Sequence, residues 1–549
     1  MRVSEVMAQL LLNRKIQSIS EATEFLSQSP KSTQGFPDTV LQAGTDLIQK
    51  HIDQGSLIFI VGDYDVDGMT STSLFLSVLN ETEAKVKFFI PHRFNDGYGL
   101  NKDLIQKVID LKAGLLITLD CGITQCEEIT FLKDNSETDV MILDHHQIPS
   151  PMPRMDVLIH PKQLEESHPC WHLCTAGIAY QFLRYFCKVK GLSVPEPKLL
   201  ELAALGTIAD IVPLVGENRR LTKLGLQCLS QRKNFGLRQL LETSKCDKPF
   251  ISARDVGFVI APRLNAAGRL THAKTGVDLL MASNLKDAEK IALELETLNQ
   301  KRREIGDRMF KEAQKMIQAD PSVLEPPVLI LSSPLWHAGV IGIIASRLVN
   351  AYGRPTILIA EDDAIGRASA RSVAKVNIYE LIFQVKDQLL KFGGHHQAAG
   401  FSVAKETIPS LMLAIRERAV ETIAMDDLGE CITLEMALFP QDINLKLVRE
   451  IEKMSPFGMG NPAPIFYTNQ LKAIEFKTVG DGSHLKVKLS ALDDSKQFDA
   501  IGFGLAEKLP VLYEDSIELA FTLEVNNWMG VETAQLVLVD IKANSKGQT

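Results

Sequence analysis

The sequence predicts an α/β protein in which a parallel-sheet domain is joined by a long helix to a smaller α/β domain and followed by a small all-β domain. Three observations lead to this prediction. Short apolar runs alternate with helical patterns between about residues 55 and 160, one apolar helical stripe extends over 285–318, and short alternating segments fill the C-terminal part. The 549 residues also exceed the roughly 250 to 300 at which a single hydrophobic core stops growing, which predicts two to four domains.

The first α/β domain is predicted from apolar runs that suit buried strands and from helical patterns between them. The expected strands cover 57–61, 86–90, 115–119, 140–143 and 157–159, and the expected helices cover 70–79 and 104–111. A second α/β pattern follows the proline-rich break at 325–327, with strands expected over 328–331 and 356–359. We therefore divide the chain into an N-terminal helical segment (1–54), a first domain (55–284), a connector helix (285–320), a second α/β domain (321–428) and a C-terminal β domain of the partly open barrel type (429–549).

The composition is typical of an ordinary folded protein and indicates the compartment in which it works. The contents of 45% hydrophobic and 23% charged residues are close to the average of globular proteins. The eight cysteines form no C-x-x-C pair, which indicates reduced thiols and a cytoplasmic protein. The start of the chain has no signal-peptide pattern, and polar residues interrupt the most apolar stretch, 328–349, so we expect no membrane span. The net charge of -9 argues against a general polyanion binder, so a nucleic-acid site has to be a local basic groove.

Three aspartates crowd the turn after the first expected strand. In the segment GDYDVDG, Asp63, Asp65 and Asp67 stand at the carboxyl end of that strand, where open α/β sheets bind ligands. Hard divalent cations, which take oxygen ligands, would relieve the mutual repulsion of these carboxylates. For this motif alone, a solvated acidic turn or a helix N-cap is an equally good interpretation.

Further possible ligands follow other strands of the same sheet. Asp120 ends the third strand, and Asp144, His145 and His146 follow the fourth, so these residues should meet at one edge. Asp210 comes from an apolar segment, where a carboxylate needs a partner. Carboxylates with imidazoles suit Mn²⁺ or Zn²⁺, and carboxylate-rich sites also accept Mg²⁺. Two such ions can activate a water and stabilise a leaving oxygen, which predicts phosphoester hydrolysis.

These residues carry a resemblance to a known superfamily. GDYDVDG, the strand end at Asp120, the DHH triplet at 144–146 and the segment of Asp210 resemble the four motifs of the DHH phosphoesterase superfamily. Within it, the whole chain resembles the RecJ family of single-strand-specific exonucleases, through PRLNAAGR at 262–269, HAGVIGIIASRL at 337–348, GGHHQAAGF at 393–401 and SPFGMGNPAPIF at 455–466.

The resemblance implies a metal-dependent 5′→3′ exonuclease of DNA recombination and repair. Such an enzyme releases 5′-mononucleotides from single-stranded DNA with two Mn²⁺ or Mg²⁺ ions. The resemblance also implies that the first domain is a DHH domain, the second a DHH-associated (DHHA1) substrate-binding domain and the third an OB-fold.

The resemblance assigns metal binding and catalysis to the residues on the motif positions: Asp63, Asp65, Asp67, Asp120, His145, His146 and Asp210. Asp144 is expected to support the histidines rather than to bind metal itself. The substrate-binding residues are expected to be Arg93, Arg263, Asn265, Arg269, His337, Ser369, Arg371, Gly393, Gly394 and His395. Among these, Arg93 is expected near the 5′ phosphate of the DNA.

The segment GRASARS, at 366–372, has two interpretations. In the first, its backbone N–H groups, Ser369 and Arg371 would hold a terminal phosphate. The alternative is an ordinary solvated turn. Its place before GGHHQAAG favours the first interpretation.

Two other patterns argue against further sites. The alternating histidines and cysteines at 168–174 would share a face only on a strand, yet they precede a predicted helix, so we expect no second metal site there. Residues 431–549 contain 11 Lys and Arg against 16 Asp and Glu, a net charge of -5. A strong electrostatic hold on DNA by the C-terminal domain is therefore not expected, unless Lys472, Lys477, Lys486 and Lys488 cluster.

Two alternative functions stay open from the sequence. A phosphodiesterase or phosphatase of the same superfamily, acting on short oligonucleotides or cyclic dinucleotides, would use the same ligands, and a non-catalytic replication scaffold would share the fold. The additional β domain and the long connector helix favour a polymeric substrate. The expected partners are single-stranded DNA, a DNA helicase and single-strand-binding protein, and the expected oligomeric state is a monomer.

Overall fold

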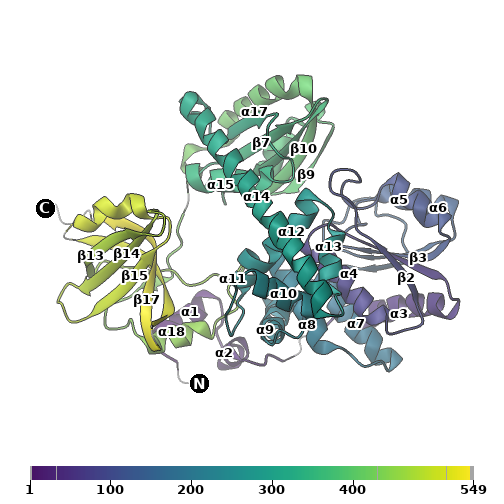
Figure 1. The fold of residues 1–549 in the computed structure, drawn as a ribbon, viewed down its shortest axis with the longest axis horizontal. Helices are drawn as coiled ribbons and strands as arrows, with labels where there is room; N and C mark the ends of the chain where they lie inside the picture. The colour runs from purple at the N-terminus through teal and green to yellow at the C-terminus, as the bar shows by residue number, and fades with distance from the viewer. Residues whose placement is uncertain (1–2, 32–33, 430, 515, 529, 545–549) are drawn as a thin grey trace.

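The structure, a computed structural model, describes residues 3–31, 34–429, 431–514, 516–528 and 530–544. These residues form three sheets of five, five and seven strands, one in each of three domains (Figure 1). The helix α14 (Leu285–Ala319) connects the first two domains. None of the helices in these ranges combines the length and the apolar character that crossing a bilayer demands. The arrangement confirms the predicted fold class.

The sheet of the first domain is parallel throughout, in the order β2-β1-β3-β4-β5. All five expected strands are present: β1 (Leu57–Gly62), β2 (Lys85–Phe89), β3 (Ala113–Leu119), β4 (Asp139–Leu143) and β5 (Val157–Ile159). Successive residues of β1 face opposite sides of the sheet. Ile58 and Ile60 pack with helices α3 (Asp38–Asp53), α4 (Val66–Leu79) and α7 (Thr175–Lys190), whereas Phe59 and Val61 pack with α5 (Lys102–Asp110) and α6 (Cys126–Asn135).

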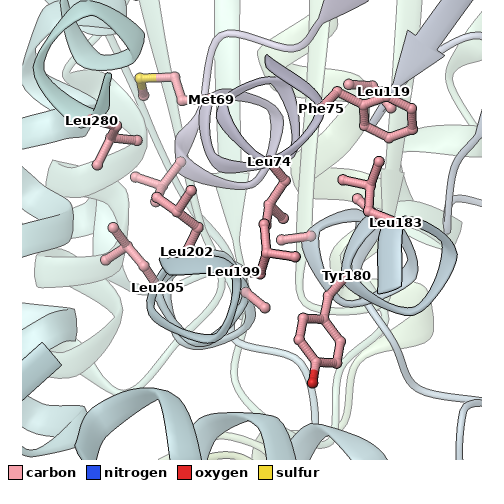
Figure 2. Packing of buried hydrophobic residues seen from close by; sticks show 14 of the residues in the cluster. Met69, Leu74, Phe75, Leu119, Tyr180, Leu183, Leu199, Leu202, Leu205 and Leu280 are labelled. Atoms are coloured by element: carbon pink, nitrogen blue, oxygen red, sulfur yellow. The ribbon is translucent and has the colours of Figure 1, made fainter. Parts of the chain in front are cut away.

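Helix α4 is buried along its whole length because α7, α8 (Glu196–Ala209) and α13 (Lys274–Leu280) pack around it (Figure 2). Its hydroxyl side chains tolerate this burial by bonding within the helix: Thr70 donates to the carbonyl of Val66 and Ser73 to that of Met69, each at 2.8 Å. The remaining helices of this domain are α9 (Gly216–Ser230), α10 (Phe235–Thr243), α11 (Ala253–Asp255) and α12 (Ala261–Leu270).

The second domain contains a mixed sheet in the order β6-β7-β8-β10-β9. Its elements are β6 (Leu329–Ser333), α15 (Ile341–Tyr352), β7 (Thr356–Glu361), β8 (Ile365–Arg371), α16 (Ile378–Phe383), β9 (Lys391–His395), β10 (Ala398–Ala404) and α17 (Ile408–Thr422). The interpretation of GRASARS as a solvated turn is wrong, because most of this segment forms β8 and pairs with β7 on one side and β10 on the other. The sheet uses its backbone N–H groups, so only side chains of this segment can hold a phosphate.

The C-terminal domain contains a sheet in the order β11-β12-β16-β17-β15-β14-β13 and the α-helix α18 (Leu445–Glu452). The strands are β11 (Met436–Ala437), β12 (Phe466–Thr468), β13 (Leu471–Val479), β14 (His484–Ala491), β15 (Gln497–Gly502), β16 (Ile517–Trp528) and β17 (Val531–Ala543). The N-terminal helices α1 (Glu5–Asn13) and α2 (Ile19–Leu26) pack into the core of this domain through Met7, Leu10 and Ala22. Residues 1–54, expected as one segment, therefore divide between two cores, since α3 covers the first sheet.

Candidate active site

Three aspartates follow β1 and surround the start of α4. Asp65 is the N-cap of α4, and its side chain accepts hydrogen bonds from the backbone N–H groups of Asp67 (2.9 Å) and Gly68 (3.2 Å). A Cβ at Gly68 would lie 2.3 Å from the carbonyl oxygen of Asp63, so this tight turn requires glycine. Asp63 and Asp67 are only 3% and 1% exposed. Asp65 is thus a cap, as the alternative interpretation has it, while the same turn buries two further carboxylates.

The N-terminus of α7 orients two of the carboxylates. Oδ2 of Asp67 accepts a hydrogen bond from the N–H of Thr175, and Oδ1 accepts one from Ala176, both at 2.8 Å. The positive end of the helix dipole favours a carboxylate at this place. Asp120 follows β3 with a left-handed backbone (φ 65°), and its Oδ1 accepts a hydrogen bond from the hydroxyl of Thr175 at 3.1 Å. One helix start therefore fixes side chains from two segments of the sheet edge.

The two histidines follow β4 and have different partners. Nε2 of His145 lies 3.3 Å from Oδ1 of Asp120 and 3.5 Å from Oδ2 of Asp210, the C-cap of α8. Nδ1 of His146 lies 2.7 Å from Oδ1 of Asp144. Asp144 is fully buried and also accepts hydrogen bonds from the backbone N–H groups of both histidines. This carboxylate orients His146 so that Nε2 stays available to a cation.

The donor atoms of this cluster fit divalent cations. Three groups have their donor atoms within 4.8 Å of one another: Asp63 with Asp65 and Asp120, Asp67 with His145 and Asp210, and Asp120 with His145 and His146. Burial, and then the neighbouring carboxylates, raises the pKa of Asp63, Asp120 and Asp210 well above its usual range. The same causes raise the pKa of Asp67 to about 6. Oδ1 of Asp63 is buried with no hydrogen-bond partner in the described part of the chain. Cations would supply the positive charge that these carboxylates lack.

A group of arginines adjoins the carboxylates. The guanidinium of Arg93 lies 4.0 Å from the centre of the Tyr64 ring, and its Nε donates to the carbonyl of Gly268 at 3.2 Å. Arg269 donates to the carbonyl of Gly339 at 3.0 Å. These contacts join the loop after β2, the end of α12 and the loop before α15.

The third arginine of the group, Arg371, extends from β8 and donates to the hydroxyl of Ser369 at 3.2 Å. A Cβ at Gly342, in the first turn of α15, would lie only 2.8 Å from that hydroxyl oxygen, so a helix N-terminus closes the group on this side. Arg93, Arg269 and Arg371 form no ion pair with a carboxylate of the described residues. Burial, and then the charge of Arg93, lowers the pKa of Arg269 to about 9, and burial lowers that of Arg371. Arg93, Arg269, Ser369 and Arg371, which we call the arginine pocket, thus suit an anion such as phosphate.

Three parts of the chain match family models: the N-terminal domain of the DHH family over residues 57–207, the DHHA1 domain over 325–421 and the RecJ OB domain over 434–540. The single-stranded-DNA-specific exonuclease RecJ of Haemophilus influenzae is 32% identical over 544 residues, which cover 96% of this chain and 94% of that protein. The chain belongs to the RecJ family. The RecJ of Bacillus subtilis is also 32% identical, over 98% of this chain and 68% of its own length.

Solved structures of RecJ share the fold. The crystal structure of RecJ from Thermus thermophilus in complex with Mn²⁺ gives a TM-score of 0.84 at 28% identity, over 99% of this chain and 76% of that one. The Mg²⁺ complex of RecJ from the same organism gives a TM-score of 0.78. The agreement extends over all three domains.

The predicted site residues of this RecJ family member fall into four sets. The expected metal ligands lie in one cluster, and their binding of metal stays a prediction. Four expected substrate residues form the arginine pocket. Arg263 has a different role, because its guanidinium is buried, pairs with Glu296 of α14 and donates to the carbonyl of Val259.

Two of the other expected substrate residues, His337 and His395, adjoin the arginine pocket or the metal-ligand cluster. Nδ1 of His337 accepts the N–H of Gly339, a residue whose carbonyl binds Arg269. His395 is on the exposed strand β9. Partial burial of the side chain lowers the pKa of His395, and the charge of the nearby His146 lowers it further. Gly393 and Gly394 precede it on this strand. Asn265 is half-buried on α12.

Two residues of the site were missed from the sequence. Gly342 lies against the arginine pocket, and although it belongs to the motif HAGVIGIIASRL, that motif does not say which residues this glycine adjoins. The hydroxyl of Tyr98 donates to the backbone carbonyl of Asp120 at 2.9 Å and lies 3.2 Å from Nδ1 of His146, so it braces two ligand segments at once. Neither residue type predicts such a contact without the fold.

Proposed function

We propose that this chain is a metal-dependent exonuclease that degrades single-stranded DNA from the 5′ end and releases 5′-mononucleotides. The RecJ relatives are named single-stranded-DNA-specific exonucleases, and we assign the same specificity to this chain. The observation that carries the proposal is that the carboxylate cluster and the arginine pocket are neighbours, joined through Tyr64. Arg93 stacks on Tyr64, and Tyr64 lies between Asp63 and Asp65 in the sequence.

In this arrangement, two successive phosphates of one strand would bind at two different places. The arginine pocket would hold the terminal 5′ phosphate by charge-assisted hydrogen bonds from Arg269, Arg371 and the hydroxyl of Ser369. The next phosphate along the strand would then lie at the carboxylate cluster. A fixed end and a fixed cleavage position give removal of one nucleotide at a time from the 5′ end.

The ligands would hold two Mn²⁺ or Mg²⁺ ions, the ions of the Thermus thermophilus complexes. Bound there, such ions would lower the pKa of a water and neutralise the charge that develops on the phosphate oxygens. The chain itself fixes the geometry. The start of α7 orients Asp67 and Asp120, and Asp144 orients His146, so little reorganisation is needed when substrate binds.

The test compares cleavage of single strands carrying a label at the 5′ or the 3′ end, with a matching blunt duplex and an Asp120→Ala control. With Mn²⁺, we expect labelled mononucleotide to appear at once from the 5′-labelled strand, and none from the duplex or the variant. Survival of long DNA while dinucleotides are hydrolysed would favour the small-substrate phosphodiesterase, and no cleavage with any metal would favour the scaffold.

The arginine pocket has its own test on strands with a 5′ phosphate or a 5′ hydroxyl. Arg371→Ala removes hydrogen bonds to a charged group, worth about 1.5–3 kcal/mol, so KM for the phosphorylated strand should rise about 10-fold to 100-fold. Arg367→Ala is the matched control, since Arg367 is on the same strand but pairs with Asp362 on the surface. Equal effects of both substitutions would contradict the pocket.

The proposed partners follow from strand specificity. An enzyme that cuts only single strands needs a DNA helicase to open a duplex, and it meets single strands covered by single-strand-binding protein. We propose both as partners of a cytoplasmic monomer. Sedimentation of the purified chain with and without each protein tests these assignments.

A further inference from the structure

One helix extends from the C-terminal domain to the arginine pocket. Helix α11, a π-helical turn (Val256–Ile260) and α12 follow one another without a break from residue 253 to residue 270, and we call this element helix 253–270. Near its start, Arg254 lies 3.6 Å from Glu524 of β16. Near its end, Arg269 is part of the arginine pocket. Figure 1 places α11 at the edge of the first domain that faces the C-terminal domain.

Four residues of helix 253–270 that are not buried, Phe258, Pro262, Asn265 and Arg269, form a stripe that leads away from the pocket. Within α12, the residues that are not buried are Pro262, Asn265, Arg269 and Leu270. Phe258 precedes Pro262 by four residues and is 73% exposed. Spacings of three and four residues place Pro262, Asn265 and Arg269 on one face of α12, and Phe258 precedes Pro262 by about one turn, in the π-helical part. The two ends of the stripe are about 16 Å apart, at 1.5 Å per residue.

Pro262 explains the π-helical turn that presents Phe258. A proline has no N–H to donate to the carbonyl four residues before it, here that of Phe258, and its ring crowds that carbonyl. The helix widens in response, and the N–H of Ala261 donates to the carbonyl of Val256. The side chain of Arg263 donates to the carbonyl of Val259 at 2.7 Å. Turns of this kind occur often at functional sites, and here the local sequence builds one directly before the helix that carries Arg269.

We propose that Phe258 is a base-stacking platform for the single strand whose 5′ phosphate lies in the arginine pocket. This inference rests on the proposed function and adds a second contact to it. Single exposed apolar residues are common on protein surfaces, so exposure alone means little. Phe258 differs because it belongs to the stripe that ends at Arg269 and stands between the pocket and the C-terminal domain.

The geometry also predicts which bases reach the ring. A stacked strand rises about 3.4 Å per nucleotide, so a distance of about 16 Å corresponds to about five nucleotides from the 5′ end, and to fewer when the strand is extended. Every base has a π face, so stacking on Phe258 should not depend on sequence. An enzyme that removes nucleotides from any sequence needs a contact of this kind.

Binding is measured apart from cleavage, in the Asp120→Ala background, with a 5′-phosphorylated 12-nucleotide single strand. Phe258→Ala and Phe258→Leu should weaken binding about fivefold to a hundredfold, whereas Phe258→Trp, which keeps an aromatic face, should stay within about twofold. Because Phe258 is exposed, unfolding temperatures should not change. Phe250→Ala, at a phenylalanine that is 80% exposed but outside helix 253–270, is the matched control. Wild-type affinity of Phe258→Leu, or an equal loss in Phe250→Ala, would overturn the proposal.

The length of the substrate separates this inference from the proposed function. With Asp120 intact, Phe258→Leu should hydrolyse a 5′-phosphorylated dinucleotide at the wild-type rate, because that substrate is too short to reach the ring, and should degrade the 12-nucleotide strand more slowly. Equal losses on both substrates would refute stacking at Phe258. A wild-type chain that cuts neither substrate, yet binds the long strand through Phe258, would contradict the exonuclease and leave the platform supported.

Discussion

The pair formed by Asp144 and His146 makes a quantitative prediction about the metal centre. Asp144→Asn keeps the shape of the side chain and removes its charge. The bond lost is charge-assisted, buried and 2.7 Å long, and such hydrogen bonds contribute about 1.5–3 kcal/mol. Although burial opposes it, the bond with His146, together with the charges of both histidines, lowers the pKa of Asp144 to about 2. We therefore expect the affinity for Mn²⁺ to fall about 10-fold to 100-fold.

The assay is a calorimetric titration with Mn²⁺, followed by nuclease activity over a range of metal concentrations. Asp139→Asn is the matched control, because Asp139 begins the same strand, β4, and its Oδ2 lies 2.9 Å from Nε2 of His51 at the opposite end of the sheet. That substitution should lower thermal stability and leave the affinity for Mn²⁺ within about twofold. Unchanged Mn²⁺ affinity in a folded Asp144→Asn variant would refute the reasoning, as would equal losses in both variants.

Three further predictions concern charge, packing and close approach. The pKa of Asp67 is raised to about 6 from an ordinary 3.8, so the metal-free protein should lose stability as the pH rises through this interval. EDTA should therefore lower Tm more at pH 8 than at pH 5, and equal shifts in Tm would contradict this. Leu202→Ala, in the core of Figure 2, should cost about 2–5 kcal/mol in a denaturant titration, against less than about 0.5 for the exposed Leu413→Ala; similar values would count against that core. Gly206→Ala would place a Cβ 2.5 Å from the Cβ of Ala176, 2.6 Å from Oγ1 of Thr70 and 2.9 Å from Oδ1 of Asp67, so it should lower kcat/KM about tenfold or more. Gly257→Ala, with open space around its Cβ, should not; wild-type activity of the first variant would contradict these contacts.

The strand β8 illustrates where sequence patterns mislead. GRASARS contains small and polar residues that are typical of turns, yet Gly366, Ala368 and Ala370 face the core of the second domain. A Cβ at Gly366 would lie 2.8 Å from a side-chain carbon of Ile359 and 2.9 Å from one of Ile408, so small residues are what this packed face allows. Strand preference depends on such neighbours, and those neighbours come from distant parts of the chain.

The segment PRLNAAGR shows a distinction that helix geometry makes. Arg263 and Arg269 are six residues apart on α12, and six residues at 3.6 per turn place them on different faces. Arg263 therefore points to α14 and pairs with Glu296, while Arg269 reaches the arginine pocket. A motif taken as a string of letters gives both arginines the same role.

The sequence by itself determined the fold class, the family resemblance and the identity of the possible metal ligands. It could do so because period-two and period-3.6 patterns are local, and because parallel strands bring their carboxyl ends to one edge. Only the tertiary structure decided that α7 orients Asp67 and Asp120, that Gly342 and Arg371 close one pocket, and that helices α1 and α2 belong to the last domain. These contacts join residues far apart in the chain, and their partners depend on packing that no local pattern encodes.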